Sequence, residues 1–284
     1  MAWLVGRQYA VTAGAPSAPS DDPAWLGLFP DQDFAFRFSA GPGDAVQYFA
    51  PTTEHNEILA ERRKWMTEFP ERHLLQEPLA DPLITEACEL AQDWGVKPGN
   101  LRELGETLEP DLVLLQDNGA GEFVMRAGAV CFPSEWAPEE KMSLPVHAIH
   151  SPVPTLNTEL GERINKFLAN LKPGVAWERT NWGMSRSPAR NQHPALGTPR
   201  LVPPFGADEA WVRSEDQILV RLPQTGGLLF GICIVNISLE EVLQHDEGAA
   251  GLHRAISTMP EAVAEYKNVA ASREHLLALL DRSA

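Results

Sequence analysis

The sequence predicts an α+β fold, in which antiparallel hairpins are flanked by helices. Three observations support this class: several short runs alternate apolar and polar residues, turn residues join these runs, and amphipathic segments of helical period lie on either side. The 284 residues are 44% hydrophobic and 22% charged, as in a globular protein that can bury a ligand. We expect an irregular N-terminal lead-in over residues 1–33 and a single domain over 34–284, which includes a C-terminal helix.

The first elements are a hairpin and two helices. Phenylalanines alternate with other residues over 34–38, GPGD follows as a turn, and 46–50 is predicted as the second strand. Apolar residues recur at helical spacing over 54–69. A second helix is expected over 81–94, with Asp81 as N-cap ahead of Pro82 and Gly95 at its end.

The middle of the chain predicts a second hairpin and a third helix. Strands over 112–115 and 122–130 flank the turn DNGAG, which contains the Asn-Gly pair typical of tight hairpins. Asn157 or Thr158 can cap a helix that ends near Leu171 and carries its apolar residues on one face.

The last part of the chain predicts strands followed by helices. Residues 177–182 alternate as a strand, and 187–205 form a long proline-rich loop. Val212, 217–222 and 228–237 read as strands, the last two joined by the turn PQTGG. Capping boxes Ser238-x-x-Glu241 and Thr258-x-x-Glu261 begin helices, the second of which is expected to run through Leu280.

Charge and cysteine content restrict the partners and the compartment. A net charge of −16 disfavours binding to nucleic acid or to an anionic membrane, because both need a clustered basic face. Three separated cysteines without a C-x-x-C pair fit a reducing compartment. We find neither a signal-peptide pattern nor an apolar run of 18 residues, so we expect a cytoplasmic protein that does not associate with a membrane.

Candidate functional residues concentrate in residues 130–190. In VHAIHSPVP, His147 and His150 lie among apolar residues and prolines, which favours the neutral imidazole that a haem iron or another metal requires. A buried histidine bonded to a carbonyl group is the alternative interpretation. A zinc site with His193 and Cys131 is a further alternative, although no recognised ligand spacing supports it.

A second group is WERTNWGMSRSPAR, in which Arg179 and Arg186 lie among aromatic residues. Arginine can grip a carboxylate with two hydrogen bonds, but both residues can equally form surface ion pairs. Trp177 and Trp182 can belong to the core, or to an aromatic wall that holds a small ammonium ion.

A row of polar residues, Arg213, Glu215, Gln217 and Arg221, occupies alternate positions of a predicted strand. Such a row lines either an internal pocket or a solvated sheet face. There is no glycine-rich strand-to-helix turn for a nucleotide and no hydrolase motif. We therefore do not expect a nucleotide cofactor bound by this chain.

Several of these motifs together resemble the haem-dependent oxidative N-demethylase family. They are CFPSEW (131–136), Lys141, IHSPVP (149–154), ERTNW (178–182) and RSEDQILVRLPQTGG (213–227), and the likeness spans residues 34–242. The resemblance implies a PAS-like antiparallel sheet whose flanking helices enclose a haem b pocket with a histidine ligand. It also implies a monooxygenase that converts dimethylamine, a small alkylamine, to methylamine and formaldehyde with O2. Electrons would come from NADPH through a separate flavin and ferredoxin-type reductase that carries FMN and an iron–sulfur centre.

The resemblance carries roles over to individual residues. It implies His150 as the iron ligand, with His147 as the fallback. Arg179, Arg186 and Lys141 would bind haem propionates or order the pocket, and Trp177, Asn181 and Trp182 would form the distal catalytic side. A thiolate ligand such as Cys131 would instead imply P450-like chemistry. A haem-binding PAS sensor of gas or redox state without turnover, and a flavin- or ligand-binding scaffold without haem, remain as other functions.

Overall fold

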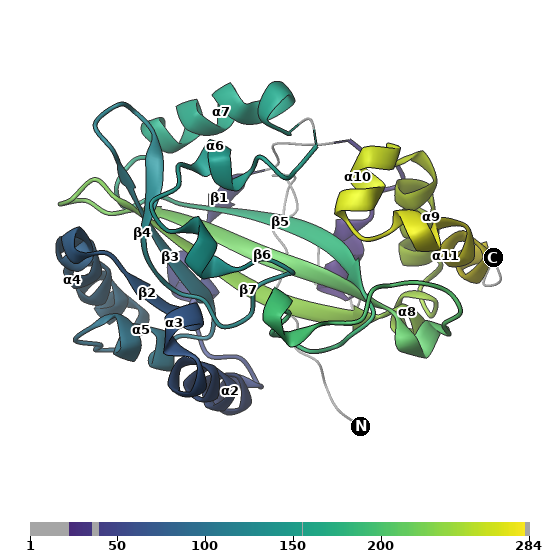
Figure 1. Ribbon diagram of the computed structural model, residues 1–284, viewed down its shortest axis with the longest axis horizontal. Coiled ribbons are helices and arrows are strands. Elements are labelled where there is room, and N and C mark those ends of the chain that lie inside the picture. Colours follow the sequence, from purple (N-terminus) through teal and green to yellow (C-terminus); the bar gives the residue numbers. More distant parts are fainter. Residues whose placement is uncertain (1–22, 36–39, 155, 282–284) are drawn as a thin grey trace, which may run out of the picture.

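The fold is α+β, as the sequence predicts, and is built on one open antiparallel sheet (Figure 1). The computed structural model describes residues 23–35, 40–154 and 156–281. Seven strands follow the order β1-β5-β6-β7-β3-β4-β2, and every neighbouring pair is antiparallel. The strands are β1 Gly41–Gly43, β2 Leu74–Gln76, β3 Asp111–Asp117, β4 Phe123–Ala129, β5 Ala176–Ser185, β6 Trp211–Arg221 and β7 Leu228–Ser238.

The helices of the described residues form three groups around this sheet (Figure 1). The first group packs on one face and comprises α1 Ala45–Tyr48, α2 His55–Glu68, α3 Pro70–His73, α4 Asp81–Leu90 and α5 Leu101–Thr107. The second group packs on the other face and comprises α6 Val146–Ile149 and α7 Leu156–Asn170. The third covers the ends of β5, β6 and β7 and comprises α8 Leu239–Val242, α9 Asp246–Thr258, α10 Glu261–Tyr266 and α11 Arg273–Leu280.

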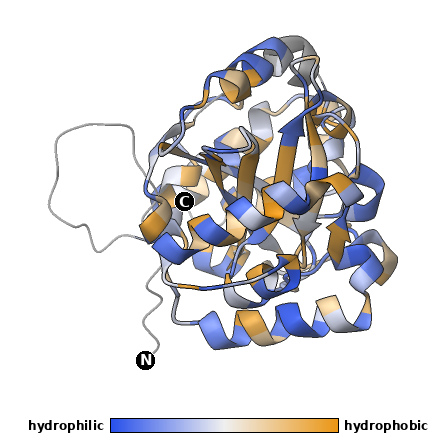
Figure 2. Cartoon of the chain, turned by 90° about the vertical axis from the view of Figure 1, so that its left-hand side faces the viewer, coloured by the Kyte–Doolittle hydropathy of each residue, from blue (hydrophilic) through white to orange (hydrophobic). Residues whose placement is uncertain are grey.

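Alternation along the central strands divides the core between the two faces of the sheet. In β3, Leu112 and Leu114 pack with the first helix group, whereas Val113 and Leu115 pack beneath α6 and α7. This is the two-residue period of a strand. The central strands carry mainly hydrophobic residues, orange in Figure 2, because both of their faces are covered. None of the helices described is both long and apolar enough to cross a membrane.

Most of the predicted elements are confirmed. The helix expected over 54–69 is α2, and the one over 81–94 is α4 followed by a 3-10 turn that ends at Gly95 with φ 86°. The hairpin around DNGAG is formed by β3 and β4. The remaining strand expectations correspond to β5, β6 and β7, and the helix expected to end near Leu171 is α7.

Three expectations in the first third of the chain are wrong. Residues 46–50 are not a strand, because the Asp44 carboxylate accepts the backbone N–H groups of Val46 and Gln47 and caps helix α1. The GPG before it is itself strand β1, paired with β5. Asp81 is the first residue of α4 and not its cap. The expected strand over 34–38 falls largely outside the described residues, as do residues 1–22 of the lead-in and the Asn157 and Thr158 side chains.

The capping boxes have different outcomes. Ser238 Oγ accepts the Glu241 N–H at 3.1 Å and caps α8, but the Glu241 carboxylate accepts from Trp25 Nε1 at 2.9 Å instead of closing the box. Thr258 is the last residue of α9 and does not cap α10, which follows Pro260. The expected C-terminal helix is interrupted after Tyr266, and Asn268 at this break has φ 59°.

Candidate functional site

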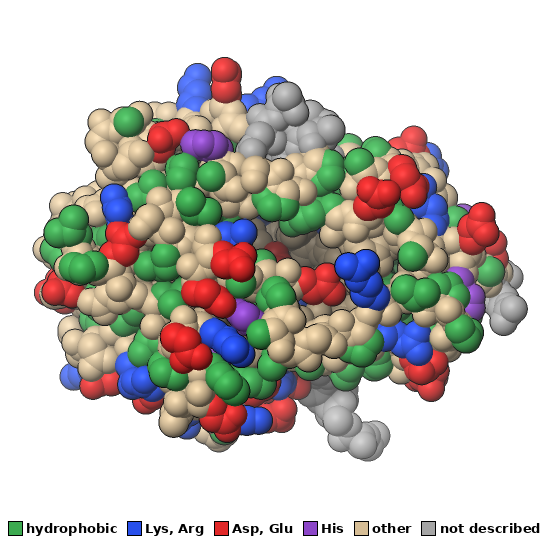
Figure 3. Space-filling model, viewed as in Figure 1, with side chains coloured by type: hydrophobic (Ala, Val, Ile, Leu, Met, Phe, Trp, Pro, Cys, Tyr) green, Lys and Arg blue, Asp and Glu red, His purple; other side chains and the backbone are tan. Residues whose placement is uncertain are grey.

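A cavity of about 610 Å³ lies between the sheet and the helices α6 and α7. This volume is in the range of small-molecule and cofactor sites, roughly 300–1,000 Å³. Apolar side chains of β3, β6 and α7 form one part of the lining, and polar side chains of β5 and β6 form another. The segment after β4 and the break after α10 complete its wall. Figure 3 shows a hollow near the middle of the face on which α6 and α10 lie.

His150 lines this cavity at the C-terminal end of α6. Pro145 precedes the helix, and the His150 N–H closes its single turn on the Val146 carbonyl at 2.9 Å. The ring atom Nδ1 is buried and has no hydrogen-bond partner among the described residues. Burial, together with the nearby positive charge of Arg179, lowers the pKa of His150 to about 4. The imidazole is therefore neutral at pH 7, the form that can donate a lone pair to a metal.

His147 is not among the residues that line the cavity. Its side chain is 48% exposed, and Nδ1 lies 3.4 Å from the Glu122 carboxylate. Although only three positions separate the two histidines, the structure gives them different surroundings. Only His150 combines burial, a partnerless ring nitrogen and a position in the cavity wall.

The three candidate cations are not brought together. Arg179 lines the cavity from β5, its Nε is buried without a partner, and burial lowers the pKa of its guanidinium. Lys141 lines the cavity from the 3-10 turn Pro138–Lys141. Arg186 lies outside the lining: it donates to the Val202 and Pro204 carbonyls and forms an ion pair with Glu209 at 2.8 Å.

Of the candidate distal residues, Asn181 and Trp182 line the cavity, but Trp177 does not. Trp177 packs edge-on against Phe167 of α7, with ring centroids 5.4 Å apart. Because Phe167 is itself part of the lining, Trp177 supports the wall from behind.

The polar row of β6 faces the cavity and not open solvent. Arg213, Glu215 and Gln217 all line it, and each is fixed by hydrogen bonds. Arg221 lies beyond the lining, where it stacks over Phe123 and donates to the Leu168 carbonyl at 3.2 Å. Of the two alternatives left open for this row, the internal pocket therefore applies to three of its four residues.

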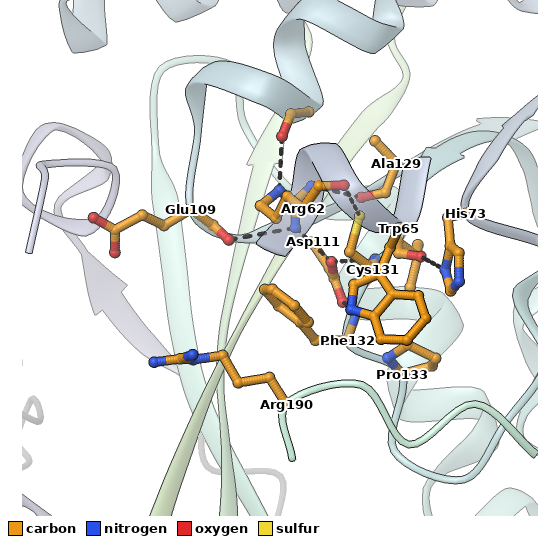
Figure 4. A network of polar contacts seen from close by, with 12 residues as sticks. Arg62, Trp65, His73, Glu109, Asp111, Ala129, Cys131, Phe132, Pro133 and Arg190 are labelled. Carbon is orange, nitrogen blue, oxygen red and sulfur yellow. Dashed lines mark hydrogen bonds and ion pairs between the residues drawn. The ribbon is translucent and has the colours of Figure 1, made fainter. Parts of the chain in front are cut away.

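A buried ion pair holds the CFPSEW segment that forms one edge of the cavity (Figure 4). Asp111 Oδ1 accepts from Arg62 Nη1 at 2.6 Å and from the Cys131 N–H at 2.6 Å, and Oδ2 accepts from the Phe132 N–H at 2.8 Å. Arg213 reaches the same segment through the Phe132 carbonyl at 2.9 Å. These contacts position Ser134, which lines the cavity.

The residues of the zinc alternative are separated by their own contacts. The His193 Nε2 atom lies 3.1 Å from both Glu139 carboxylate oxygens, whereas the Cys131 thiol faces the Arg62 carbonyl at 3.7 Å. Burial raises the pKa of Cys131 to about 12, so this thiol does not become a thiolate near pH 7. Within the ranges that the structure describes, no group of three His, Cys, Asp or Glu side chains could hold a metal ion.

Sequence reasoning missed three cavity residues that come from loops. Lys267 and Asn268 enter from the break after α10, and Glu135 enters from the segment after β4. Glu135 and Asn268 both have positive φ, and the Asn268 amide donates to the Glu135 carboxylate at 3.4 Å. No periodicity marks them. The one available signal is a lysine in an apolar C-terminal segment, which is weak because lysine is usually solvated.

A comparison with protein families supplies the identification. The model of the family described as "Haem-dependent oxidative N-demethylase, alpha subunit-like" matches residues 54–277, which is more than half of the chain. The match includes α6, the strands β5 to β7 and the break after α10, and so contains His150, Arg179, Glu215 and Lys267. The resemblance seen in the sequence motifs is thereby confirmed, and the chain belongs to the haem-dependent oxidative N-demethylase alpha subunit-like family.

Proposed function

We propose that this chain binds haem b in the cavity and catalyses the oxidative N-demethylation of a small secondary amine. Dimethylamine is the leading candidate, with methylamine and formaldehyde as products and O2 as oxidant. The observation that carries the proposal is the neutral His150 ring, whose buried Nδ1 has no partner at the wall of a cavity of suitable size, in a chain of a haem-dependent family. Bound haem would supply an iron centre that activates dioxygen.

His150 would hold the iron. A neutral imidazole in an apolar wall fits this role, and the low pKa of His150, about 4, keeps the ring unprotonated in the physiological range. His147 is less suited, because it is half exposed and already paired with Glu122. The high pKa of Cys131 argues equally against a thiolate ligand.

Arg179 and Lys141 would bind the haem propionates. The guanidinium of Arg179 is buried with an unsatisfied Nε, and a buried donor of a charged group without a hydrogen-bond partner is costly. A carboxylate in the cavity would relieve that cost by charge-assisted hydrogen bonds. Arg186 would order the loop over residues 202–209 instead, since its donors are used there.

Asn181 and Trp182 would shape the side of the cavity on which the amine and O2 meet, and Trp177 would support that wall through Phe167. The PAS-like description of the core is part of this proposal. It is supported by the open antiparallel sheet with helices over the face that carries the cavity. Electrons would be delivered by a partner reductase with FMN and an iron–sulfur centre that oxidises NADPH, because the sequence has no nucleotide-binding motif.

The first test is an absorption spectrum of the protein reconstituted with haem. We expect a Soret band at a stoichiometry of one haem per chain. His150→Ala should abolish stoichiometric binding, whereas the matched variant His147→Ala should retain it. Loss of haem in His147→Ala with retention in His150→Ala would move the ligand to His147, and the absence of a Soret band in the parent protein would refute the haem proposal.

The second test is activity. With dimethylamine, O2 and a reductase or chemical reductant, we expect formaldehyde and methylamine in equal amounts. Stoichiometric haem without amine-dependent formaldehyde release would refute the enzymatic proposal and favour a sensor of gas or redox state.

A further inference from the structure

Five side chains form one hydrogen-bonded chain along the polar wall of the cavity. At one end, Arg213 Nε donates to Ser134 Oγ at 2.8 Å, and the Ser134 hydroxyl donates to Glu215 Oε1 at 2.7 Å. At the other end, Lys267 Nζ donates to Asn181 Oδ1 at 3.2 Å, and Asn181 Nδ2 donates to Glu215 Oε2 at 3.3 Å. From each end, the hydrogen bonds run from a cation through one neutral side chain to the Glu215 carboxylate.

Glu215 has acceptor capacity left over. Besides the hydrogen bonds from Ser134 and Asn181, Glu215 accepts one from Gln217 Nε2 at 3.0 Å, also on Oε2. An ionised carboxylate offers about four acceptor sites, so three donors leave a site on Oε1. Because Glu215 belongs to the cavity lining, a ligand with an N–H group can donate a hydrogen bond to the remaining acceptor site on Oε1.

The surroundings of Glu215 carry more positive than negative charge. The hydrogen-bonded row contains two cations, Arg213 and Lys267, and one anion, Glu215 itself. Arg179 adds a third cation from the neighbouring strand β5. The hydrogen-bond acceptors of the Lys267 ammonium are neutral groups, namely Asn181 Oδ1 and the Trp182 carbonyl. Burial, and secondarily Arg179, lower the pKa of Lys267 to about 8 against the opposing effect of Glu215. Lys267 is therefore mostly charged at pH 7.

The other titratable groups of the lining do not reverse this balance. They are Glu135, Glu140, Lys141, His150 and Tyr266. Within the described residues Glu215 accepts from Ser134, Asn181 and Gln217 and from none of these five, and the Glu135 carboxylate accepts from Asn268 instead. An additional ammonium ion next to Glu215 would therefore be desolvated beside like charges, which is unfavourable. An un-ionised amine meets no such repulsion.

We propose that this wall selects the un-ionised form of a small amine, whose N–H donates to Glu215, and discriminates against the corresponding alkylammonium. The inference rests on the proposed function in one respect, that the cavity is the amine site. It names the ionisation state that binds and makes the N–H group the feature that is recognised. The un-ionised amine also retains the nitrogen lone pair that oxidation at the adjacent methyl group requires.

The test is a calorimetric titration of the haem-loaded protein with dimethylamine between pH 6 and 7.5, with buffer ionisation corrected. An alkylammonium has a pKa similar to that of lysine, about 10.4, so the un-ionised fraction rises tenfold per pH unit. We expect the dissociation constant for total amine to fall about thirtyfold across this window. A constant that stays level or rises with pH would overturn the proposal.

Trimethylamine is the matched ligand, because its un-ionised form has no N–H. At the same concentration of un-ionised amine it should bind at least tenfold more weakly than dimethylamine. Equal affinity would show that recognition does not depend on an N–H donated to Glu215.

Variants test the role of charge. Lys267→Met removes one cation and should admit the ammonium, so that the pH effect falls from about thirtyfold to less than threefold. Lys172→Met, at an exposed position outside the lining, should retain the full effect, and an unchanged effect in Lys267→Met would overturn the discrimination by charge. The titrations need no turnover. The expected pH effect without formaldehyde release would refute the proposed activity alone, and formaldehyde release without the pH effect would refute this inference alone.

Discussion

Replacement of Asp111 by alanine should strongly destabilise the protein and loosen one edge of the cavity. Asp111 is 1% exposed, and its carboxylate accepts three hydrogen bonds, from the Arg62 guanidinium and from the N–H groups of Cys131 and Phe132 (Figure 4). Alanine removes both acceptor oxygens and so all three hydrogen bonds. It also leaves the fully buried Arg62 without its anion, although the Gly105 and Ala129 carbonyls still accept from the guanidinium.

The expected loss follows from these contacts. Removing one partner of a buried ion pair costs about 3–5 kcal/mol, because the remaining charge is uncompensated. The carbonyl groups that Arg62 retains moderate this cost, whereas the two unsatisfied backbone N–H groups add to it, at about 1–3 kcal/mol each when they stay buried. We expect a loss of at least about 4 kcal/mol, which is a large fraction of the roughly 5–15 kcal/mol by which a typical protein is stable to unfolding.

Urea denaturation measures this loss as the change in the free energy of unfolding. The matched control is Asp117→Ala, in which an exposed aspartate loses two hydrogen bonds from Gly119 and Gly121 in the hairpin turn. The control should lose less than about 1 kcal/mol, because water replaces the lost partners. The double variant Arg62→Leu/Asp111→Leu should lose less than the sum of the two single leucine variants, since no unpaired charge remains. A loss below 1 kcal/mol for Asp111→Ala, or strict additivity in the double variant, would refute the reasoning.

Two further predictions concern α9 and Lys267. Gly251→Ala in helix α9 should destabilise the protein by about 2 kcal/mol in thermal or urea unfolding, because the added Cβ would overlap the Phe29 carbonyl oxygen. Alanine normally favours a helix interior, so a stabilised Gly251→Ala would contradict the packing. The control is Gly27→Ala, whose added Cβ meets no atom within 4 Å. Folding lowers the pKa of the buried Lys267 from 10.5 to about 8. Between these pH values the unfolded chain binds more protons than the folded protein, so stability rises with pH. The free energy of unfolding of the parent protein, relative to that of Lys267→Met, should therefore increase by roughly 3 kcal/mol from pH 8 to 10.5. Urea unfolding at several pH values measures this difference, and a constant difference would rule out the linkage.

Local sequence patterns were sufficient where an element depends on its own residues and near neighbours. Alternation over 213–217 placed Arg213, Glu215 and Gln217 on one strand face, which proved to be the cavity face. The same reasoning failed at residues 46–50, where one capping carboxylate, Asp44, makes the chain helical. It also failed after Tyr266, because the expected helix pattern continues across a break.

The sequence by itself determined the α+β class, the central hairpins, the longer helices and a set of polar and aromatic residues suited to a buried site. Only the tertiary structure decided which of them meet. Periodicity reports neighbours within a few positions, whereas a cavity joins side chains such as Lys267 and Asn181, which are 86 positions apart. For the same reason, packing of distant elements separates His147 from His150 and directs Arg186 toward Glu209, so that His150 and Arg179 face the cavity without them.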